Sequence, residues 1–249
     1  MDNEDRIELK SKVEGKTYFA FKRGKKISRA INSILFNPNL DAWINFREAM
    51  KANSIDEISN ENLSKLLYSM AISFCASIDL IKDGDQKTPG TFFEYFVAYF
   101  YAWRFGIEPQ NAIDIMTPDE GSTKLHTDFI FDLGVKRPKF HMPVKTSSRE
   151  RSIMLWAHQK LLDGVYGIQR FIGTPVLLAE TKTDKSKKEV VEICMPEQWR
   201  VYQLYVAQIR RIYYFDLPVA YSKLQDEFPP LVVKPFGEFF HEFDDLKNL

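Results

Sequence analysis

Hydrophobic residues in the first third of the chain recur every three or four positions, as they do on one face of an α-helix. This spacing predicts helices over Ser28–Phe36, Leu40–Ala52 and Ser59–Ile81. In the last segment the repeating apolar residues are Leu63, Leu66, Leu67, Met70, Ile72 and Phe74. A polar stretch, Lys82–Gly90, then interrupts the pattern. We therefore expect residues 1–85 to form an N-terminal helical region, which serves in DNA contact or dimer support, and residues 86–249 to form the main core.

The segment Thr91–Gly106 is almost wholly aromatic and aliphatic for four turns, which predicts a helix buried on most of its surface. Glu94 is the one acid inside it. Burying an unpaired acid costs several kcal/mol, so Glu94 is expected to be paired, bound to a metal or placed at the wall of a cleft. Alternatively, Glu94 lies on a solvent-exposed stripe with Arg104.

Strand and helix patterns alternate in the rest of the chain. We expect a loop over Asn111–Glu120 and a helix from Ser148 to about Phe171. A second helix is expected over Pro196–Gln208. Strands are predicted at Leu125–Leu133, Lys139–Lys145, Thr174–Lys182, Glu189–Met195 and Arg210–Pro218. Helices followed by interleaved strands and helices predict an α/β or α+β core with a central mixed β-sheet, onto which an apolar C-terminal tail docks.

Charge gives no general sign of a nucleic-acid partner. The 249 residues include 34 Lys and Arg and 34 Asp and Glu, for a formal net charge of zero. Net charge does not reveal local patches, so a basic cleft remains possible. One basic run, Lys22–Arg29, either contacts phosphate or is a solvated charged stretch.

Cysteine content and the N-terminus indicate a cytoplasmic protein. The two cysteines, Cys75 and Cys194, are expected to be reduced, which argues against a disulfide framework and a structural zinc site. The highly charged first ten residues do not resemble a signal peptide. No apolar run approaches the length needed to cross a bilayer, so no membrane partner is expected.

Three charged residues are candidates for phosphodiester chemistry. A hairpin between the strands at Leu125–Leu133 and Lys139–Lys145 would bring Asp128 and Lys145 to the same end of a sheet. Hydrolysis of a phosphodiester needs a divalent metal, carboxylates that hold it, and a cation that positions or activates water. Glu94, Asp128 and Lys145 can supply the protein's share of that set.

Arg149, Glu150 and Arg151 follow the lysine at the expected start of a helix. Arginine can bind the O6 and N7 atoms of guanine in a bidentate manner, and glutamate can accept a hydrogen bond from the amino group of cytosine. The three residues therefore suit neighbouring G·C pairs. A surface cluster of ion pairs at a helix N-terminus is the alternative.

The order of these elements resembles the PD-(D/E)XK nucleases, and within them the type II restriction endonucleases that recognise CCGG, CCNGG or CCWGG. The resemblance covers residues 90–170: a helix glutamate at Glu94, a strand aspartate at Asp128, and the motif K-x-x-x-R-E-R from Lys145 to Arg151. It implies a restriction-endonuclease-like α/β core in which Asp128 binds Mg²⁺ and Lys145 assists the attacking water. Arg149, Glu150 and Arg151 would then read G and C bases.

Two positions depart from the family pattern. Pro143 stands two residues before Lys145, where the motif has an acid, and the helix position that commonly supplies the missing carboxylate is His158, followed by Gln159. Either His158 or Gln159 supports the metal or water through a nitrogen or an amide oxygen, or Glu94 takes a larger share. Asp163 lies too far along the helix.

Other enzyme classes lack their motifs in this chain. The four histidines have no H-E-x-x-H spacing, and the sequence has no phosphate-binding glycine loop and no nucleophile elbow around Ser147 or Ser148. The chain is therefore expected to be a Mg²⁺-dependent type II restriction endonuclease that cuts double-stranded DNA at a short palindrome with CC:GG pairs. It would act as a homodimer, or as dimers paired into a tetramer, and a cognate DNA methyltransferase would modify the same site. The rival is a catalytically inactive DNA-binding protein with a nuclease-like fold.

Overall fold

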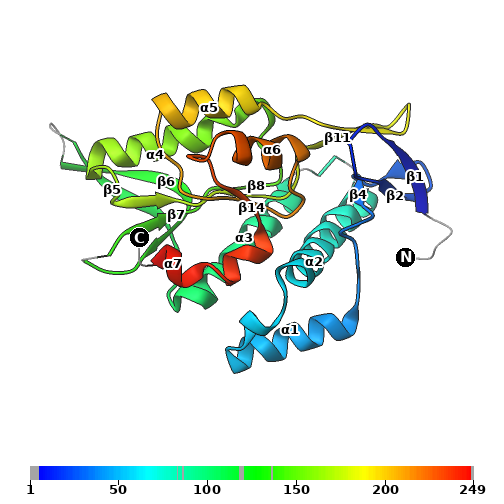
Figure 1. Ribbon diagram of the computed structural model, residues 1–249, viewed down its shortest axis with the longest axis horizontal. Coiled ribbons are helices and arrows are strands. Elements are labelled where there is room, and N and C mark those ends of the chain that lie inside the picture. The colour runs from blue at the N-terminus through cyan, green and yellow to red at the C-terminus, as the bar shows by residue number, and fades with distance from the viewer. Residues whose placement is uncertain (1–5, 83, 86, 118–120, 136, 248–249) are drawn as a thin grey trace.

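The computed structural model describes residues 6–82, 84–85, 87–117, 121–135 and 137–247. It consists of a mixed β-sheet between two layers of helices, with a second sheet formed largely by the N-terminal strands (Figure 1). The expected α/β core with a central mixed sheet is confirmed.

The central sheet has two halves. One half has the strand order β5 (Gln110–Thr117), β6 (Gly121–Asp132), β7 (Lys139–His141) and β9 (Phe171–Gly173), in which only the β7–β9 pair is parallel. The other half is wholly parallel and has the order β14 (Val233–Pro235), β13 (Ile212–Tyr214), β10 (Val176–Leu177) and β8 (Val144–Lys145). β7 leads directly into β8, and β9 leads into β10.

Two prolines divide the halves. Pro143 lies between β7 and β8, and Pro175 lies between β9 and β10. Because proline has no N–H, it cannot donate to the ladder of hydrogen bonds. Other groups bridge the division: Thr174 N donates to His141 O at 2.8 Å, and Val176 N donates to Pro143 O at 2.9 Å. The expected single strand over 139–145 is therefore broken at a proline, whereas the one expected over 174–182 begins after Pro175 and is interrupted at residues 178–180.

Helices cover both faces of the central sheet (Figure 1). The helices α2 (Asn60–Ile81), α3 (Lys87–Phe105) and α7 (Phe243–Lys247), with the 3-10 helix η4 (Phe236–Phe240), lie on one face. The helices α4 (Ile153–Tyr166), α5 (Pro196–Tyr205) and α6 (Val219–Glu227) lie on the other. Adjacent strand residues point to opposite faces. Tyr213 accordingly belongs to the core of the first face and Tyr214 to the core of the second.

The first part of the N-terminal region is not helical. The strands β1 (Arg6–Ser11), β2 (Tyr18–Arg23), β3 (Lys26–Ile27) and β4 (Ile31–Asn32) join β11 (Thr181–Asp184) and β12 (Glu189–Glu192) in a six-stranded sheet. The predicted helix over Ser28–Phe36 is therefore wrong. Ile7 and Leu9 already alternate with charged residues at the strand period. β1 is completed by a parallel pairing with β12, far along the chain, which local spacing does not reveal.

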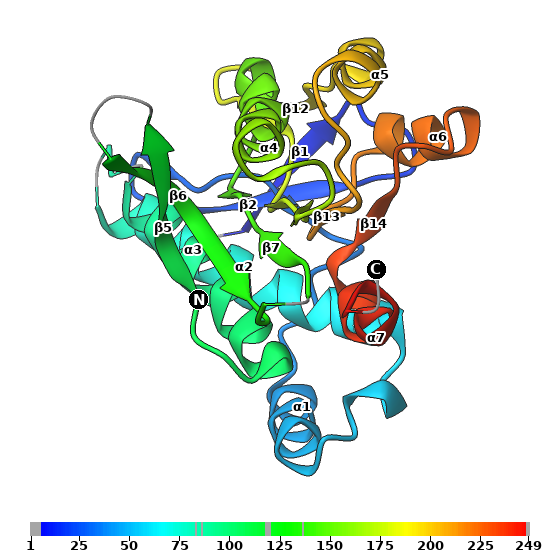
Figure 2. The same cartoon turned by 90° about the vertical axis from the view of Figure 1, so that its left-hand side faces the viewer.

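The two other N-terminal helices are confirmed. α1 (Leu40–Ala52) has the predicted bounds, with Asn39 as N-cap, and a short 3-10 helix, η2 (Ile55–Glu57), leads on to α2. Figures 1 and 2 show α1 at the periphery, beyond α2. The role of residues 1–85 in DNA contact or dimer support stays a prediction.

A buried lysine joins the N-terminal sheet to the core. Lys16 Nζ lies 2.6 Å from an Asp216 carboxylate oxygen and 2.7 Å from a Glu192 oxygen, and it donates to Leu217 O at 2.7 Å. Asn32 also donates to Asp216, at 3.0 Å. The Asp216 side chain is only 2% exposed, so this ion pair is shielded from solvent.

Three further expectations need correction. Residues 110–117 form β5 rather than a loop, because they pair with β6; Pro118–Glu120 lie outside the described residues. α4 ends at Tyr166, before the predicted Phe171, because Gly167 turns the chain with a φ of 95°. α2, at 22 residues, is long and apolar enough to cross a membrane by length and composition, although 56% of its most apolar window is buried inside the protein.

Candidate active site

The predicted pair of Asp128 and Lys145 comes together in the structure. Lys145 Nζ lies 2.6 Å from Asp128 Oδ2, and the same oxygen accepts a hydrogen bond from Val144 N at 2.8 Å. After Pro143 the chain no longer pairs with β6. The Asp128 carboxylate therefore accepts the hydrogen bond of Val144 N, which a backbone carbonyl of a neighbouring strand would otherwise accept. The lysine side chain remains 44% exposed, so its ammonium group can meet a substrate from solvent.

Glu94 of α3 lies on the same site. Burial, and then the negative charge of Asp128, raise the pKa of Glu94 above its ordinary value, while Lys145 acts in the opposite direction. Two carboxylates that repel each other in this way form a place where a divalent cation is stabilised. The alternative of a solvent stripe shared with Arg104 does not fit, because the Arg104 side chain is only 10% exposed and donates to Asp56 and to Phe240 O.

These carboxylates fit Mg²⁺, which is often held by one or two carboxylates, waters and substrate phosphates. Within the described parts of the chain, no three His, Cys, Asp or Glu side chains gather into a metal cluster. A metal here would thus rely on Asp128 and Glu94, together with oxygens from water and DNA.

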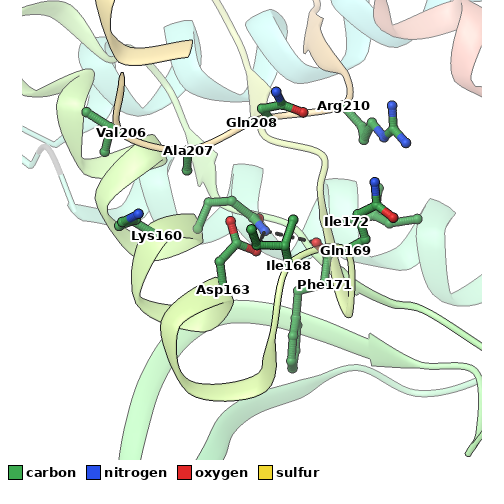
Figure 3. A pocket seen from close by; sticks show the side chains of 11 residues that line it. Lys160, Asp163, Ile168, Gln169, Phe171, Ile172, Val206, Ala207, Gln208 and Arg210 are labelled. Carbon is green, nitrogen blue, oxygen red and sulfur yellow. Dashed lines mark hydrogen bonds between the residues drawn. The ribbon is translucent and has the colours of Figure 1, made fainter. Parts of the chain in front are cut away.

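Gln159 does not take the place of the missing acid. Its side chain is 1% exposed, and its amide nitrogen donates to Phe171 O and to Asp163 Oδ1, both at 2.9 Å. This amide lines a different cavity, of about 230 Å³, between the end of α4 and residues 206–210. Figure 3 shows Asp163, Phe171 and Lys160 around that cavity. Neither Asp128 nor Lys145 is among the residues lining it.

His158 is better placed than Gln159. Its ring centroid lies 6.0 Å from that of His141, a fully buried residue of β7. Burial, and then the charge of His158, lower the pKa of His141 to about 3, so His141 is neutral at physiological pH. Nε2 of His141 is 2.8 Å from Thr127 Oγ1, next to Asp128. His141 therefore supports the strand that carries the aspartate, and His158 remains the candidate to assist the metal or water.

The predicted reading residues occupy a 3-10 turn, η3 (Arg149–Arg151), directly before α4. Arg149 and Arg151 are exposed, as base-reading residues must be in the absence of DNA. Arg149 has a φ of 44°, which is uncommon for a residue with a side chain. The backbone of Glu150 belongs to the turn, but its side chain lies outside the described part of the structure.

Glu180 is a residue of this site that sequence reasoning missed. It is 1% exposed, and its carboxylate accepts hydrogen bonds from Ser147, Ser148, Arg149 and Tyr214. The available signal was a single acid at the end of a buried apolar strand, in V-L-L-A-E.

The basic run Lys22–Arg29 lies on the β2–β3 hairpin and the chain that follows it. Arg29 donates to Asp79 from its backbone N at 2.8 Å and from two guanidinium nitrogens at 2.8 and 2.9 Å, and Lys26 donates to Ile81 O at 3.2 Å. These two residues fasten the hairpin to α2. Lys22, Arg23 and Lys25 are exposed.

No protein-family model and no curated protein matches the sequence. Among solved structures, the crystal structure of the Type IIP restriction endonuclease Kpn2I matches with a TM-score of 0.81 and 25% sequence identity, over 98% of this chain and 85% of that chain. The chain has a restriction-endonuclease fold. A complex of the restriction endonuclease PspGI with substrate DNA is a weaker match, with a TM-score of 0.48 and 15% identity over 84% of this chain and 90% of that chain. The restriction-endonuclease fold extends over nearly the whole chain, including the N-terminal strands.

Proposed function

We propose that this protein is a Mg²⁺-dependent type II restriction endonuclease, which hydrolyses phosphodiester bonds of double-stranded DNA at a specific site. The observation that carries the proposal is the Asp128–Lys145 pair, 2.6 Å apart, with Glu94 beside it and the exposed Arg149 and Arg151 just downstream. The extensive similarity to Kpn2I supports the same function.

Each residue has a distinct part in the proposed reaction. Asp128 and Glu94 would hold the metal, which supplies charge neutralisation at the scissile phosphate and a lowered pKa of bound water. Lys145 would position the attacking water and offset negative charge on the phosphate. Lys145 Nζ lies 2.6 Å from Asp128 Oδ2, so the amine and the carboxylate would act at the same phosphate.

The reading residues support a site that contains CC:GG pairs. Arg149 and Arg151 would bind guanine through O6 and N7, and Glu150 would accept from cytosine. The proposed site is a short palindrome, and its two-fold symmetry would be met by a homodimer. A cognate methyltransferase would protect the same sequence in a restriction–modification system, and the protein would act in the cytoplasm, where the DNA is.

Exposed apolar residues support the homodimer. Met154, Leu161 and Val165 lie at helical spacing along the outside of α4, and Val201, Leu204 and Tyr205 lie on α5. α4 begins two residues after Arg151. Two protomers that read adjacent half-sites would bring their α4 helices close to the symmetry axis, so a second copy of this chain is the occupant that fits these residues.

Digestion of a plasmid tests the proposal against the rival function. The protein is expected to give discrete fragments with Mg²⁺ and none with EDTA, and sequencing of the fragment ends would give the site and the cut position. Retardation of DNA in a gel without cutting, over a range of Mg²⁺ and Mn²⁺ concentrations, would favour the catalytically inactive DNA-binding protein.

Glu94→Gln should make the metal-free protein more stable while lowering cleavage. A carboxyl whose pKa is raised by folding stabilises the protein at low pH, and this contribution is lost as the pH rises through the raised pKa. Glutamine carries no charge to be repelled by Asp128. At pH 7 the melting temperature of the variant should therefore exceed that of the native protein, and below pH 4.5, the ordinary pKa, the difference should vanish.

Glu61→Gln is a control with the opposite sign. Lys65 lowers the pKa of Glu61, so this substitution should not raise the melting temperature at pH 7.

Mg²⁺ should stabilise the native protein more than Glu94→Gln, because Glu94 is a proposed ligand. If Mg²⁺ raises the melting temperatures of the two proteins equally, Glu94 is not a ligand of the metal.

A further inference from the structure

Glu180 lies where three parallel strands end. Beyond β8 and β10 the backbone pairing continues for two steps, with Leu178 N donating to Lys145 O at 3.1 Å and Ala179 N donating to Thr146 O at 3.2 Å. After these two residues the strands are joined by a side chain: the Glu180 carboxylate accepts hydrogen bonds from Ser147 Oγ and Ser148 N. Tyr214, the last residue of β13, approaches the same carboxylate from the next strand. The carboxyl ends of parallel strands are where α/β proteins commonly place functional groups.

The Glu180 carboxylate accepts all its hydrogen bonds from neutral groups. Oε1 accepts from Ser148 N at 2.8 Å, Ser148 Oγ at 2.6 Å and Tyr214 OH at 2.9 Å. Oε2 accepts from Ser147 Oγ at 2.7 Å and Arg149 N at 3.1 Å. A carboxylate has about four acceptor positions on its two oxygens, so these five hydrogen bonds use its full capacity. Hydrogen bonds to the charged form offset the cost of burying it.

Four of these hydrogen bonds come from the segment Ser147–Arg149, which joins Lys145 to the reading residues. That segment includes the left-handed backbone of Arg149, with a φ of 44°. A non-glycine residue in this conformation persists only where its surroundings impose it. The hydrogen bond from Arg149 N to Glu180 and the bond from Arg149 Nη2 to Thr181 O, at 3.4 Å, are contacts that impose it.

We propose that Glu180 is a positioning residue for DNA recognition: its buried carboxylate fixes Ser147–Arg149, and thereby sets where Arg149 and Arg151 meet the bases. The inference rests on the proposed nuclease function and names a residue that determines its specificity. Because the segment starts two residues after Lys145, the same carboxylate also fixes the position of the reading residues relative to the proposed cleavage site.

Glu180→Gln tests the proposal, because it preserves the side-chain volume and replaces one acceptor oxygen by an NH₂ group that faces donors. The measurement is the ratio of cleavage rates on the recognised site and on sites with one changed base pair, below the melting temperature of each protein. Glu180→Gln should lower this ratio by about tenfold or more, since each well-formed bidentate contact accounts for roughly 5- to 150-fold discrimination.

Two single-donor variants separate positioning from general support of the core. Ser147→Ala removes a donor that belongs to the segment, whereas Tyr214→Phe removes one that does not. Positioning predicts that Ser147→Ala lowers the discrimination ratio more than Tyr214→Phe does. The proposal is overturned if all three variants melt at a lower temperature than the native protein but keep its ratio of cleavage rates on the recognised and changed sites.

Hydrogen exchange in the free protein keeps the test independent of the nuclease function. The backbone amides of Ser148 and Arg149 should exchange at least tenfold faster in Glu180→Gln than in the native protein, while amides of α4 keep their rates. Unchanged exchange at both amides would overturn the role of Glu180. If the native protein cuts no DNA, the proposed function fails, whereas faster exchange still supports the positioning of the segment.

Discussion

Asp128→Asn is expected to lower DNA cleavage by about 10³-fold or more while leaving DNA binding largely intact. Asparagine keeps the side-chain volume and an oxygen that can accept from Val144 N, but it removes the charge that would hold Mg²⁺ and that faces Lys145 at 2.6 Å. A loss of about 4 kcal/mol of charge stabilisation in the transition state corresponds to that factor. Single-turnover cleavage of a duplex with one site is the measurement.

The same strand offers a matched control. Asp132 Oδ2 also lies 2.6 Å from a lysine nitrogen, Lys139 Nζ. The side chains of Asp132 and Lys139 are 31% and 32% exposed. Asp132→Asn removes the same charge from the same strand, at a place where no substrate is proposed to bind. Cleavage by this variant should stay within about twofold of the native rate, as is usual for exposed ion pairs. Normal cutting by Asp128→Asn would show that the site is assigned wrongly.

Arg151→Ala is expected to weaken discrimination at one base pair by about 1–3 kcal/mol, or roughly 5- to 150-fold. The exposed guanidinium would form two parallel hydrogen bonds with guanine, and alanine forms none. Arg149→Ala should act in the same way at its own base pair. Affinities for the recognised site and for each single-base variant of it, at a fixed salt concentration, measure the effect.

Arg151→Lys distinguishes a base contact from a phosphate contact. Lysine keeps the positive charge but lacks the planar fork of donors, so it should restore non-specific binding without restoring discrimination. Arg170→Ala, an exposed arginine beyond the opposite end of α4, is the control and should leave discrimination unchanged. Full rescue by lysine would mean that Arg151 contacts the DNA backbone rather than a base.

Local patterns were sufficient for α1 and α2, although they wrongly predicted a helix over Ser28–Phe36. α1 and α2 begin at capping residues, Asn39 and Ser59, and their apolar residues recur at the helical period, so their bounds follow from neighbouring residues. Strands depend on partners that are distant in the chain. β1 needs β12 to complete its pairing, and these hydrogen bonds are not local. β5, which was also missed, pairs with the next strand, β6.

The same contrast between local and distant partners applies to the residues of the candidate site. Asp128 and Lys145 could be paired from sequence because β6, which carries Asp128, forms a hairpin with β7, and β7 leads directly into β8 and Lys145. Glu180 could not be placed, because it lies more than thirty residues from Ser147 and meets it only through the parallel pairing of β8 and β10. The roles of Glu94, Asp128, Lys145, Arg149, Glu150 and Arg151 in DNA cleavage stay predictions.

Lys16 limits how far the protein can be shortened. A fragment that starts at residue 86 would retain Asp216 and Glu192 but lose the ammonium group between them. Removal of one partner from a buried ion pair typically costs about 3–5 kcal/mol, because the remaining charge is left without compensation. The part of the chain that carries the candidate site therefore depends on the amino-terminal strands for its stability, and the two parts are best treated as one cooperative unit.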